Sequence, residues 1–273
     1  MEMSISNTPA LHQVEDPTWS CVDFISDLHL SAQSPETLQA LESYLFKTPA
    51  QAVFILGDLL EVWIGDDSLD HEAFSVERSC LHMIQEAGLR TPIFFMPGNR
   101  DFLIGERFFA ESGMRALHDP CVLKTQGKRI LLSHGDALCT TDVDYQNFRQ
   151  QVRSESWQIQ FLSMPFDDRL SMALQLRAQS QEKQAMMQPG EHADLDHKAC
   201  LGELLKHQCE LMIHGHTHRP KRHELDSSHA REVLSDWDAT SLPPEPKCFD
   251  WKTPDSSAWI SFKALAPKHK CCG

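Results

Sequence analysis

The sequence predicts an α/β protein whose β-sheet is at least partly parallel. Short apolar runs rich in β-branched and aromatic residues recur along the chain as CVDFIS, QAVFIL, IFFMP, RILLS and ELMI. Runs of this length are typical of buried strands. Amphipathic stretches lie between them, which favours alternating strands and helices. With 273 residues, 41% of them hydrophobic, the chain is long enough to bury a full core.

The helices are predicted from start signals and apolar spacing. Ser34 and Pro35 open the first, with Ser34 as the N-cap. Its predicted buried stripe consists of Thr37, Leu38, Leu41 and Leu45. A second helix is expected over residues 69–88, closed by Gly88.

Three segments differ from this pattern. Residues 1–20 are expected to form a disordered or loosely docked N-terminal extension to a domain over 21–240. Residues 141–200 lack a strand-like run and place apolar side chains near helical spacing, which predicts a helical insertion. The alternative is two further core helices. Residues 241–273 form a Pro-rich, irregular tail in which AWISFKAL can add an edge strand.

Composition excludes some classes of protein. The formal net charge of −14 argues against a nucleic-acid partner, since such binding relies on Lys and Arg. The nine cysteines include no CxxC pair, which indicates free thiols in a reducing cytoplasm. The first 15 residues lack the apolar core of a signal peptide. No apolar run approaches the ~18–20 residues that span a bilayer, although attachment to a membrane surface remains open.

Each of the five apolar runs ends in side chains that can bind a metal ion. In an open α/β sheet, ligands bind beyond the carboxyl ends of the strands. The candidate ligands are Asp27, His29, Asp58, Asn99, His134, His216 and His218. They offer nitrogen and oxygen donors and no sulfur. Seven side chains are too many for one tetrahedral zinc and fit two adjacent cations that share a carboxylate.

The local spacing supports this interpretation. Asp27 and His29, like His216 and His218, are two residues apart, which in extended backbone places both side chains on one side. A glycine precedes three of the proposed ligand positions, at Gly57, Gly98 and Gly215. Glycine permits positive φ and leaves room beside the chain for cations and a phosphate group.

The ordered motifs DLH, GDLLE, GNRD, HGD and GHTH resemble those of the calcineurin-like metallophosphoesterases over roughly residues 22–236. This resemblance implies a sandwich of two mixed β-sheets flanked by helices, with a helical lid insertion and a dinuclear centre at one edge. It assigns one metal to Asp27, His29, Asp58 and His218. It assigns the other to Asp58, Asn99, His134 and His216, with Asp58 as the bridge.

The third motif carries Arg100 where many members of that family have a histidine that protonates an alcohol leaving group. Arginine does not readily release a proton but binds phosphate oxygens bidentately. A leaving phosphate from a pyrophosphate needs little protonation. Arg100 therefore favours diphosphate cleavage over the cleavage of alkyl phosphodiesters.

The longer matches FILGDLLEVWIGDD and LLSHGDALCTTDVDYQNFR are similar to the branch of the family that cleaves UDP-linked diacylglucosamine to UMP and a lipid 1-phosphate in lipid A synthesis. This similarity implies a monomer, peripherally associated with the cytoplasmic face of the bacterial inner membrane, with the lid over the acyl chains. It implies that a metal-activated hydroxide attacks phosphorus. The implied catalytic residues are Asp58, Asn99, Arg100 and His216. The implied substrate contacts are Asn99, Arg100, Asp142, Ser180, Gln184, Met187 and His216, where Met187 replaces the usual lysine.

Several assignments have alternatives. His and carboxylate ligands favour Mn, Fe or Zn over Ca, and we expect two Mn²⁺ ions per chain. The rival functions are hydrolysis of soluble nucleotide pyrophosphates or phosphodiesters, and a scaffold without metals. His214 is expected to support neighbouring ligands. Asp101 either orients a ligand or caps a helix that begins at Phe102. The basic patch Arg219-Lys221-Arg222 is either solvated surface or a contact for anionic lipid headgroups.

Overall fold

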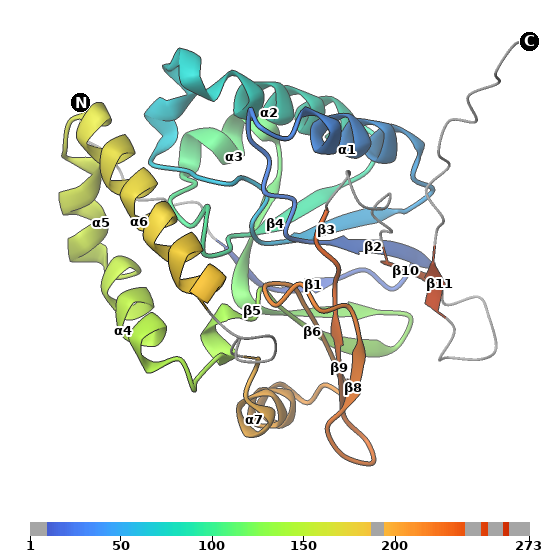
Figure 1. Ribbon diagram of the computed structural model, residues 1–273. Coiled ribbons are helices and arrows are strands. Elements are labelled where there is room, and N and C mark those ends of the chain that lie inside the picture. The colour runs from blue at the N-terminus through green and yellow to red at the C-terminus, as the bar shows by residue number, and fades with distance from the viewer. Residues whose placement is uncertain (1–9, 187–193, 238–246, 251–258, 262–273) are drawn as a thin grey trace, which may run out of the picture.

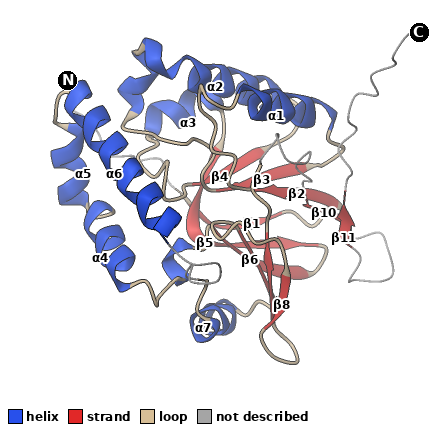
Figure 2. Ribbon diagram, viewed as in Figure 1, coloured by secondary structure: helices blue, strands red, loops and turns tan. Residues whose placement is uncertain are grey.

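The fold is a curled β-sheet with helices on its outer faces (Figures 1 and 2). It is taken from a computed structural model that describes residues 10–186, 194–237, 247–250 and 259–261. The strands are β1 Leu11–Glu15, β2 Cys21–Ile25, β3 Ala52–Leu56, β4 Ile93–Met96, β5 Arg115–Thr125, β6 Lys128–Ser133, β7 Leu211–His214, β8 Arg222–Glu224, β9 Ala230–Val233, β10 Lys247–Asp250 and β11 Trp259–Ser261. The helices are α1 Pro35–Lys47, α2 Ser75–Gly88, α3 Glu106–Ser112, α4 Val143–Val152, α5 Glu155–Leu162, α6 Phe166–Met186 and α7 His197–His207.

The sheet runs in the order β11-β10-β2-β3-β4-β5-β6-β7-β9-β8, and β1 pairs with β5 off this path. Strands β2, β3 and β4 are mutually parallel, and so are β6, β7 and β9. The long strand β5 belongs to both halves of the sheet. Its first residues pair with β4 in parallel, and its later residues pair with β6 in antiparallel fashion. The two parallel groups therefore meet at one bent strand.

Three buried clusters hold the layers together. Between the two halves of the sheet, Phe24, Phe54 and Phe94 pack with Leu123 and Leu132. A second cluster packs α1, α2 and α3 on the outer face of β2–β4. A third packs α7 on the outer face of β5–β7. The chain is thus a sandwich of two mixed sheet halves flanked by helices, which confirms the predicted fold class.

The predicted strands and helices exist, with corrections at their ends. The five apolar runs form β2, β3, β4, β6 and β7. Helix α1 buries Thr37, Leu41 and Leu45 as expected, but the Ser34 side chain makes no capping hydrogen bond. Helix α2 begins at Ser75, later than predicted, because two short 3₁₀ turns occupy Asp66–Asp70 and Glu72–Phe74.

The N-terminal extension was predicted wrongly in part. Its residues 11–15 form β1, which pairs in parallel with β5 and buries Val14 against the sheet. Strand β5 was also missed, since His118, Asp119 and Pro120 interrupt its apolar pattern. In the tail, β11 lies at the edge of the sheet and pairs with β10, as expected for AWISFKAL.

Residues 143–186 form the three helices α4, α5 and α6, which lie beside one another at one end of the sandwich (Figure 1). Phe161 of α5 is buried in the cluster beneath α1–α3, with Trp157, Phe166 and Leu170 partly buried against it. We call these three helices the lid. Helix α7, which follows, packs Cys200 and Leu204 on the sheet and belongs to the body. Within the described residues, no helix is long and apolar enough to cross a membrane.

Candidate metal centre

All seven predicted ligands lie where strands of the two sheet halves end. Asp27 and His29 follow β2, Asp58 follows β3 and Asn99 follows β4. His134 follows β6, while His216 and His218 follow β7. The carboxyl ends of these parallel strands meet at the same edge, as expected for an α/β sheet.

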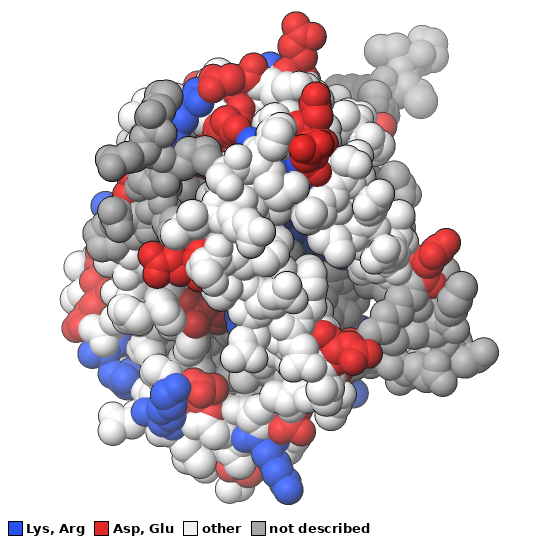
Figure 3. All heavy atoms as spheres, turned by 90° about the vertical axis from the view of Figure 1, so that its left-hand side faces the viewer, with Lys and Arg blue, Asp and Glu red and all other residues white. Residues whose placement is uncertain are grey.

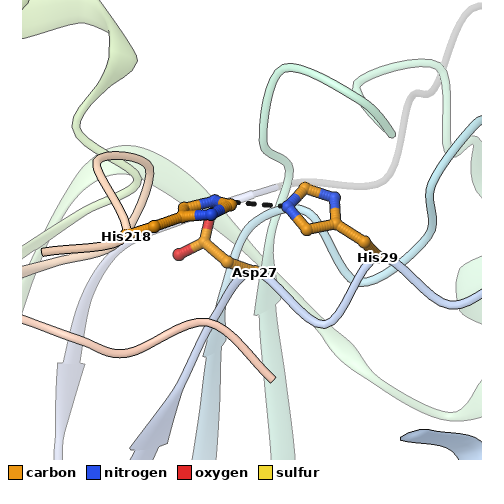
Figure 4. A group of neighbouring side chains, drawn as sticks. All are labelled: Asp27, His29 and His218. Carbon is orange, nitrogen blue, oxygen red and sulfur yellow. Dashed lines mark hydrogen bonds and ion pairs between the residues drawn. The ribbon is translucent and has the colours of Figure 1, made fainter. Parts of the chain in front are cut away.

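One group of donors consists of Asp27, His29 and His218, whose nearest ligand atoms lie within 4.8 Å of one another. The Nε2 atoms of His29 and His218 are 3.3 Å apart, and Nε2 of His218 is 3.4 Å from Oδ1 of Asp27. Figure 4 shows the two rings facing each other beside the Asp27 carboxylate. Two neutral imidazoles and a carboxylate at this spacing can share a single cation.

A second group consists of Asp27, Asp58 and His134, also within 4.8 Å of one another. Oδ1 of Asp58 lies 3.7 Å from Nε2 of His134, and its Oδ2 lies 3.9 Å from Nε2 of His29. Asp58 therefore reaches both groups, as the bridging role requires. Oδ1 of Asn99 lies 3.0 Å from Nε2 of His134 and 2.9 Å from Nδ1 of His216, so all seven predicted side chains converge.

The backbone at the site adopts a conformation that L-residues rarely adopt. The φ angle is positive at five of the seven predicted ligands: Asp27, His29, Asp58, His216 and His218. Positive φ in non-glycine residues is costly, and it is concentrated at functional sites held by the surrounding fold. Asp27 and His29, like His216 and His218, therefore do not lie in the extended backbone that their two-residue spacing predicts.

The glycines have a different role from the predicted one at two positions. Gly57 has a φ of +92°, as expected, but Gly98 and Gly215 do not have positive φ. Glycine is needed at these two positions because the neighbouring atoms leave no room for a side chain. A Cβ atom on Gly98 would collide with the main chain and carboxylate of Asp58, and one on Gly215 would collide with Ser26 and Asp27.

Hydrogen bonds orient the acidic and histidine side chains. The backbone N–H of His216 donates to both carboxylate oxygens of Asp27, and the N–H of Arg100 donates to Oδ1 of Asp58 at 2.9 Å. Nδ1 of His134 lies 2.9 Å from the carbonyl oxygen of Leu56. Donation of Nδ1–H to that carbonyl leaves the lone pair of Nε2 for a metal ion.

Asp101 orients the strand ends and does not cap a helix at Phe102, since α3 begins only at Glu106. Its buried carboxylate accepts hydrogen bonds from the backbone N–H groups of Leu59, Leu60 and Gly98. This ties the loop carrying Asp58 to the loop carrying Asn99.

His214 is buried next to the predicted ligands and contacts Gly215 and Arg231. Its Nδ1 lies 2.9 Å from the carbonyl oxygen of Gly215, and its Nε2 lies 3.1 Å from Nη1 of Arg231. Burial lowers the pKa of His214 to about 3.

The carboxylates and histidines strongly perturb one another. Burial alone would raise the pKa of Asp27, but His218, His134 and His29 hold it below its usual range. Burial would lower the pKa of His134, yet the charges of Asp58, Asp136 and Asp27 raise it to about 9. Burial, followed by the charge of His134, lowers the pKa of His216 to about 4. Such a buried cluster of opposing charges is typical of functional sites.

The residues predicted to contact the substrate lie in different surroundings. Arg100 is partly buried at the centre, and no hydrogen-bond partner lies by its buried Nε atom among the described residues. Asp142 caps α4 by accepting a hydrogen bond from the N–H of Tyr145. Ser180 lies partly buried on α6. Gln184 also lies on α6, but its side chain is outside the described part, as is the whole of Met187.

Sequence reasoning missed a buried polar network that joins the lid to the metal edge. Asp136 accepts hydrogen bonds from the Tyr145 hydroxyl and from Nε of Arg149. The ring of Tyr145 stacks on His216, and Nη2 of Arg153 donates to the carbonyl oxygen of Gly98. The sequence contains the residues of this network in the HGD motif and in the Tyr-Gln-Asn-Phe-Arg segment. Only the fold brings Asp136 into contact with Tyr145 and Arg149.

The donor set fits two divalent cations. It combines the carboxylates of Asp27 and Asp58, the amide oxygen of Asn99 and four imidazoles at an edge where Asp27, Asp58 and His134 are buried and His218 is exposed. Oxygen and imidazole nitrogen donors suit Mn, Fe or Zn, and the shared carboxylate of Asp58 suits a pair. Without cations, two buried carboxylates this close would repel each other.

The fold and the converging donors define a metallophosphoesterase. The family description "Calcineurin-like phosphoesterase" matches residues 22–220, and the chain belongs to this family. Within it, the chain is 41% identical over 225 residues to the UDP-2,3-diacylglucosamine hydrolase of Stenotrophomonas maltophilia (strain R551-3), covering 78% of this chain and 90% of that protein. It is 44% identical over 220 residues to the enzyme of the same name from Serratia proteamaculans (strain 568), with the same coverage. For that of Aeromonas hydrophila subsp. hydrophila the identity is 42% over 219 residues, covering 78% and 89%.

Proposed function

We propose that this chain is a metal-dependent hydrolase that cleaves the pyrophosphate of UDP-2,3-diacylglucosamine to UMP and 2,3-diacylglucosamine 1-phosphate, a step of lipid A biosynthesis. The convergence of seven donor side chains from five strand ends carries the hydrolytic part of the proposal. The substrate follows from 40–44% identity to hydrolases of that name along most of both chains.

Asp27, His29, Asp58 and His218 would hold one cation, and Asp58, Asn99, His134 and His216 the other. We propose Mn²⁺ for both, because carboxylate, amide and imidazole donors around a shared carboxylate suit a roughly octahedral pair. Two such cations lower the pKa of a water molecule and neutralise charge on phosphate oxygens. The cluster in this chain supplies the negative charge that retains them.

Arg100 would bind the phosphate oxygens. Its backbone N–H is fixed by Asp58, while its buried Nε has no hydrogen-bond partner among the described residues. A buried guanidinium donor without a partner is costly and is satisfied by a bidentate phosphate. Asn99 and His216, in contact through Oδ1 and Nδ1, border the same space and would stabilise charge on the equatorial oxygens.

The lid would bind the acyl chains of the substrate and contact the membrane. Five of the eight large hydrophobic side chains exposed in the described part of the chain lie on it: Val143, Phe148, Ile159, Leu174 and Leu176. Figure 3 shows that wide areas of this face carry neither acidic nor basic side chains. Exposed apolar side chains concentrated on one element mark a site for lipid or another apolar partner. We further propose peripheral association with the cytoplasmic face of the inner membrane.

We also propose that residues 21–240 form the phosphoesterase domain, to which β1 of the preceding segment 1–20 adds a strand, with a helical insertion within 141–200 that ends before α7 and a tail at 241–273. Asp142, Ser180, Gln184 and Met187 would contact the sugar-lipid part of the substrate, since they lie at the start of α4 and at the end of α6 or just beyond it.

The decisive experiment offers the purified protein, with Mn²⁺, three substrates in parallel: UDP-2,3-diacylglucosamine, a dinucleotide polyphosphate and bis-nitrophenyl phosphate. The expected result is release of UMP and the lipid 1-phosphate with a kcat/KM far above those of the soluble compounds. Faster cleavage of either soluble compound would refute the lipid substrate. The same assay with Mg²⁺, Zn²⁺ or Fe²⁺ tests the choice of Mn²⁺.

A further inference from the structure

The carboxylate of Glu61 lies between a predicted metal ligand and the lid. Its Oε2 is 3.2 Å from Nδ1 of His29, and its Oε1 forms an ion pair with Nη2 of Arg177 on α6. Glu61 and Arg177 are each about one-fifth exposed. One carboxylate thus contacts both the metal edge and the longest lid helix.

The contact with His29 involves the ring nitrogen that faces away from the other donors. Nε2 of His29 faces the donor cluster, at 3.3 Å from Nε2 of His218 and 3.9 Å from Asp58. Nδ1 faces Glu61. A carboxylate on Nδ1 selects the tautomer, holds the ring plane and leaves the lone pair of Nε2 for a cation.

His134 in the second donor group is held differently. Its Nδ1 lies 2.9 Å from the carbonyl oxygen of Leu56, the last residue of β3. The orientation of His134 therefore depends on the sheet itself. The orientation of His29 depends on a side chain whose other oxygen is bound to the lid. The rings of His29 and His134 are therefore held by different parts of the fold: a side chain paired with the lid for His29, and the main chain of β3 for His134.

Among the described side chains of helix α6, two arginines pair with the loop after the second motif. Arg169, which is buried, donates from Nη1 to the carbonyl oxygen of Ile64 and pairs with Asp67. Arg177, eight residues or about 12 Å further along the helix, pairs with Glu61. Of these two attachments, the one at Arg177 involves the carboxylate that contacts a predicted ligand.

We propose that Glu61 is a positioning residue that orients His29, and that its ion pair with Arg177 couples the docking of α6 to the metal site formed by Asp27, His29 and His218. This inference rests on the dinuclear centre proposed above. Coupling of this kind is reciprocal. A cation bound at this site stabilises the docked helix, and loss of the ion pair lowers the affinity of the site for the cation.

The first test measures the Mn²⁺ affinity of each of the two sites in the absence of substrate. Chelator competition and electron paramagnetic resonance distinguish the two sites. Glu61→Ala is expected to weaken one of the two sites by about 10- to 100-fold and to leave the other unchanged. Glu61→Gln is expected to weaken it less, because an amide oxygen in the same place still faces Nδ1 of His29. Asp70→Asn is the matched control: it breaks a surface ion pair with Arg107 and should change neither site.

The second test measures hydrogen exchange of α6 with and without Mn²⁺. Metal is expected to protect α6 in the native chain and to protect it much less in Arg177→Met. Native affinity at both sites in Glu61→Ala would overturn the proposal, and so would equal weakening of both sites or unchanged protection in Arg177→Met. A native chain that binds no Mn²⁺ at all would instead refute the dinuclear centre.

Discussion

The amide oxygen of Asn99 lies 3.0 Å from Nε2 of His134, although the strands that present them, β4 and β6, are not neighbours in the sheet. Strand β5 separates them and pairs with both. The two residues meet because the sheet bends along β5, which brings the ends of its two halves together. The candidate metal centre therefore lies across the seam of the sandwich.

Asp58 is expected to be indispensable because its two carboxylate oxygens face different donor groups, with Oδ1 3.7 Å from Nε2 of His134 and Oδ2 3.9 Å from Nε2 of His29. Replacing Asp58 with Ala should lower metal-dependent kcat by about 10³-fold or more, with loss of bound Mn²⁺. Steady-state kinetics and metal content measure both effects. Asp58→Asn, which can still accept the hydrogen bond from Arg100, should keep the fold. Near-native, metal-dependent turnover by the alanine variant would contradict the proposed centre.

Replacing Gly98 is predicted to destabilise the protein and to weaken metal binding. In Gly98→Ala the added methyl group meets the main chain and carboxylate of Asp58. We expect a loss of about 1–3 kcal/mol in the free energy of unfolding and weaker metal binding. Urea unfolding and Mn²⁺ titration provide the measurements. Gly202→Ala on α7 is the control, since nothing lies within 4 Å of its added Cβ. That variant should be as stable as the native chain or more so.

Arg100→Lys should separate phosphate binding from metal binding. A lysine keeps the charge but cannot make the bidentate contact. We expect kcat/KM to fall about 10- to 100-fold while both metal affinities stay native, since the contact with Asp58 uses the backbone N–H. An unchanged kcat/KM would show that the side chain of Arg100 does not contact the scissile diphosphate.

Metal binding should release protons at neutral pH. Neighbouring carboxylates raise the pKa of His134 to about 9, so the metal-free chain carries a proton there below that pH. A protonated imidazole cannot bind a cation, so the apparent affinity should rise about 10-fold per pH unit up to pH 9 and then level off. Calorimetry in buffers of different ionisation enthalpy counts the protons. His134→Asn should release one proton fewer, and equal proton counts would refute this explanation.

The exposed apolar side chains of the lid should matter only for acylated substrates. Ile159 and Leu174 are 52% and 55% exposed. Changing either to Ser should raise KM for UDP-2,3-diacylglucosamine about 5-fold through lost apolar contact. Cleavage of an analogue with very short acyl chains should be unaffected. Leu89→Ser, equally apolar and 85% exposed but outside the lid, should change neither. Equal effects on both substrates would argue against acyl-chain contact.

The sequence alone predicts much of the candidate site. Strands buried on both faces are continuous apolar runs, and each run here ends in a donor within a few residues. Both signals are local, so they predict β2, β3, β4, β6 and β7 and the seven side chains that the structure brings together. Strand β5 is not predicted, because His118, Asp119 and Pro120 break its pattern. The sequence also predicts α-helix from residue 69, where the structure has two 3₁₀ turns before α2.

The amino-acid order thus predicts the seven side chains that converge and the class of chemistry, since short-range pattern and residue type carry that information. It does not predict that five of the seven side chains belong to residues with positive φ, or that Gly98 and Gly215 lie where no side chain fits. It also could not place Glu61 between His29 and Arg177. Those relationships join segments far apart in the chain, and they exist only once the sheet has bent and the lid has packed against it.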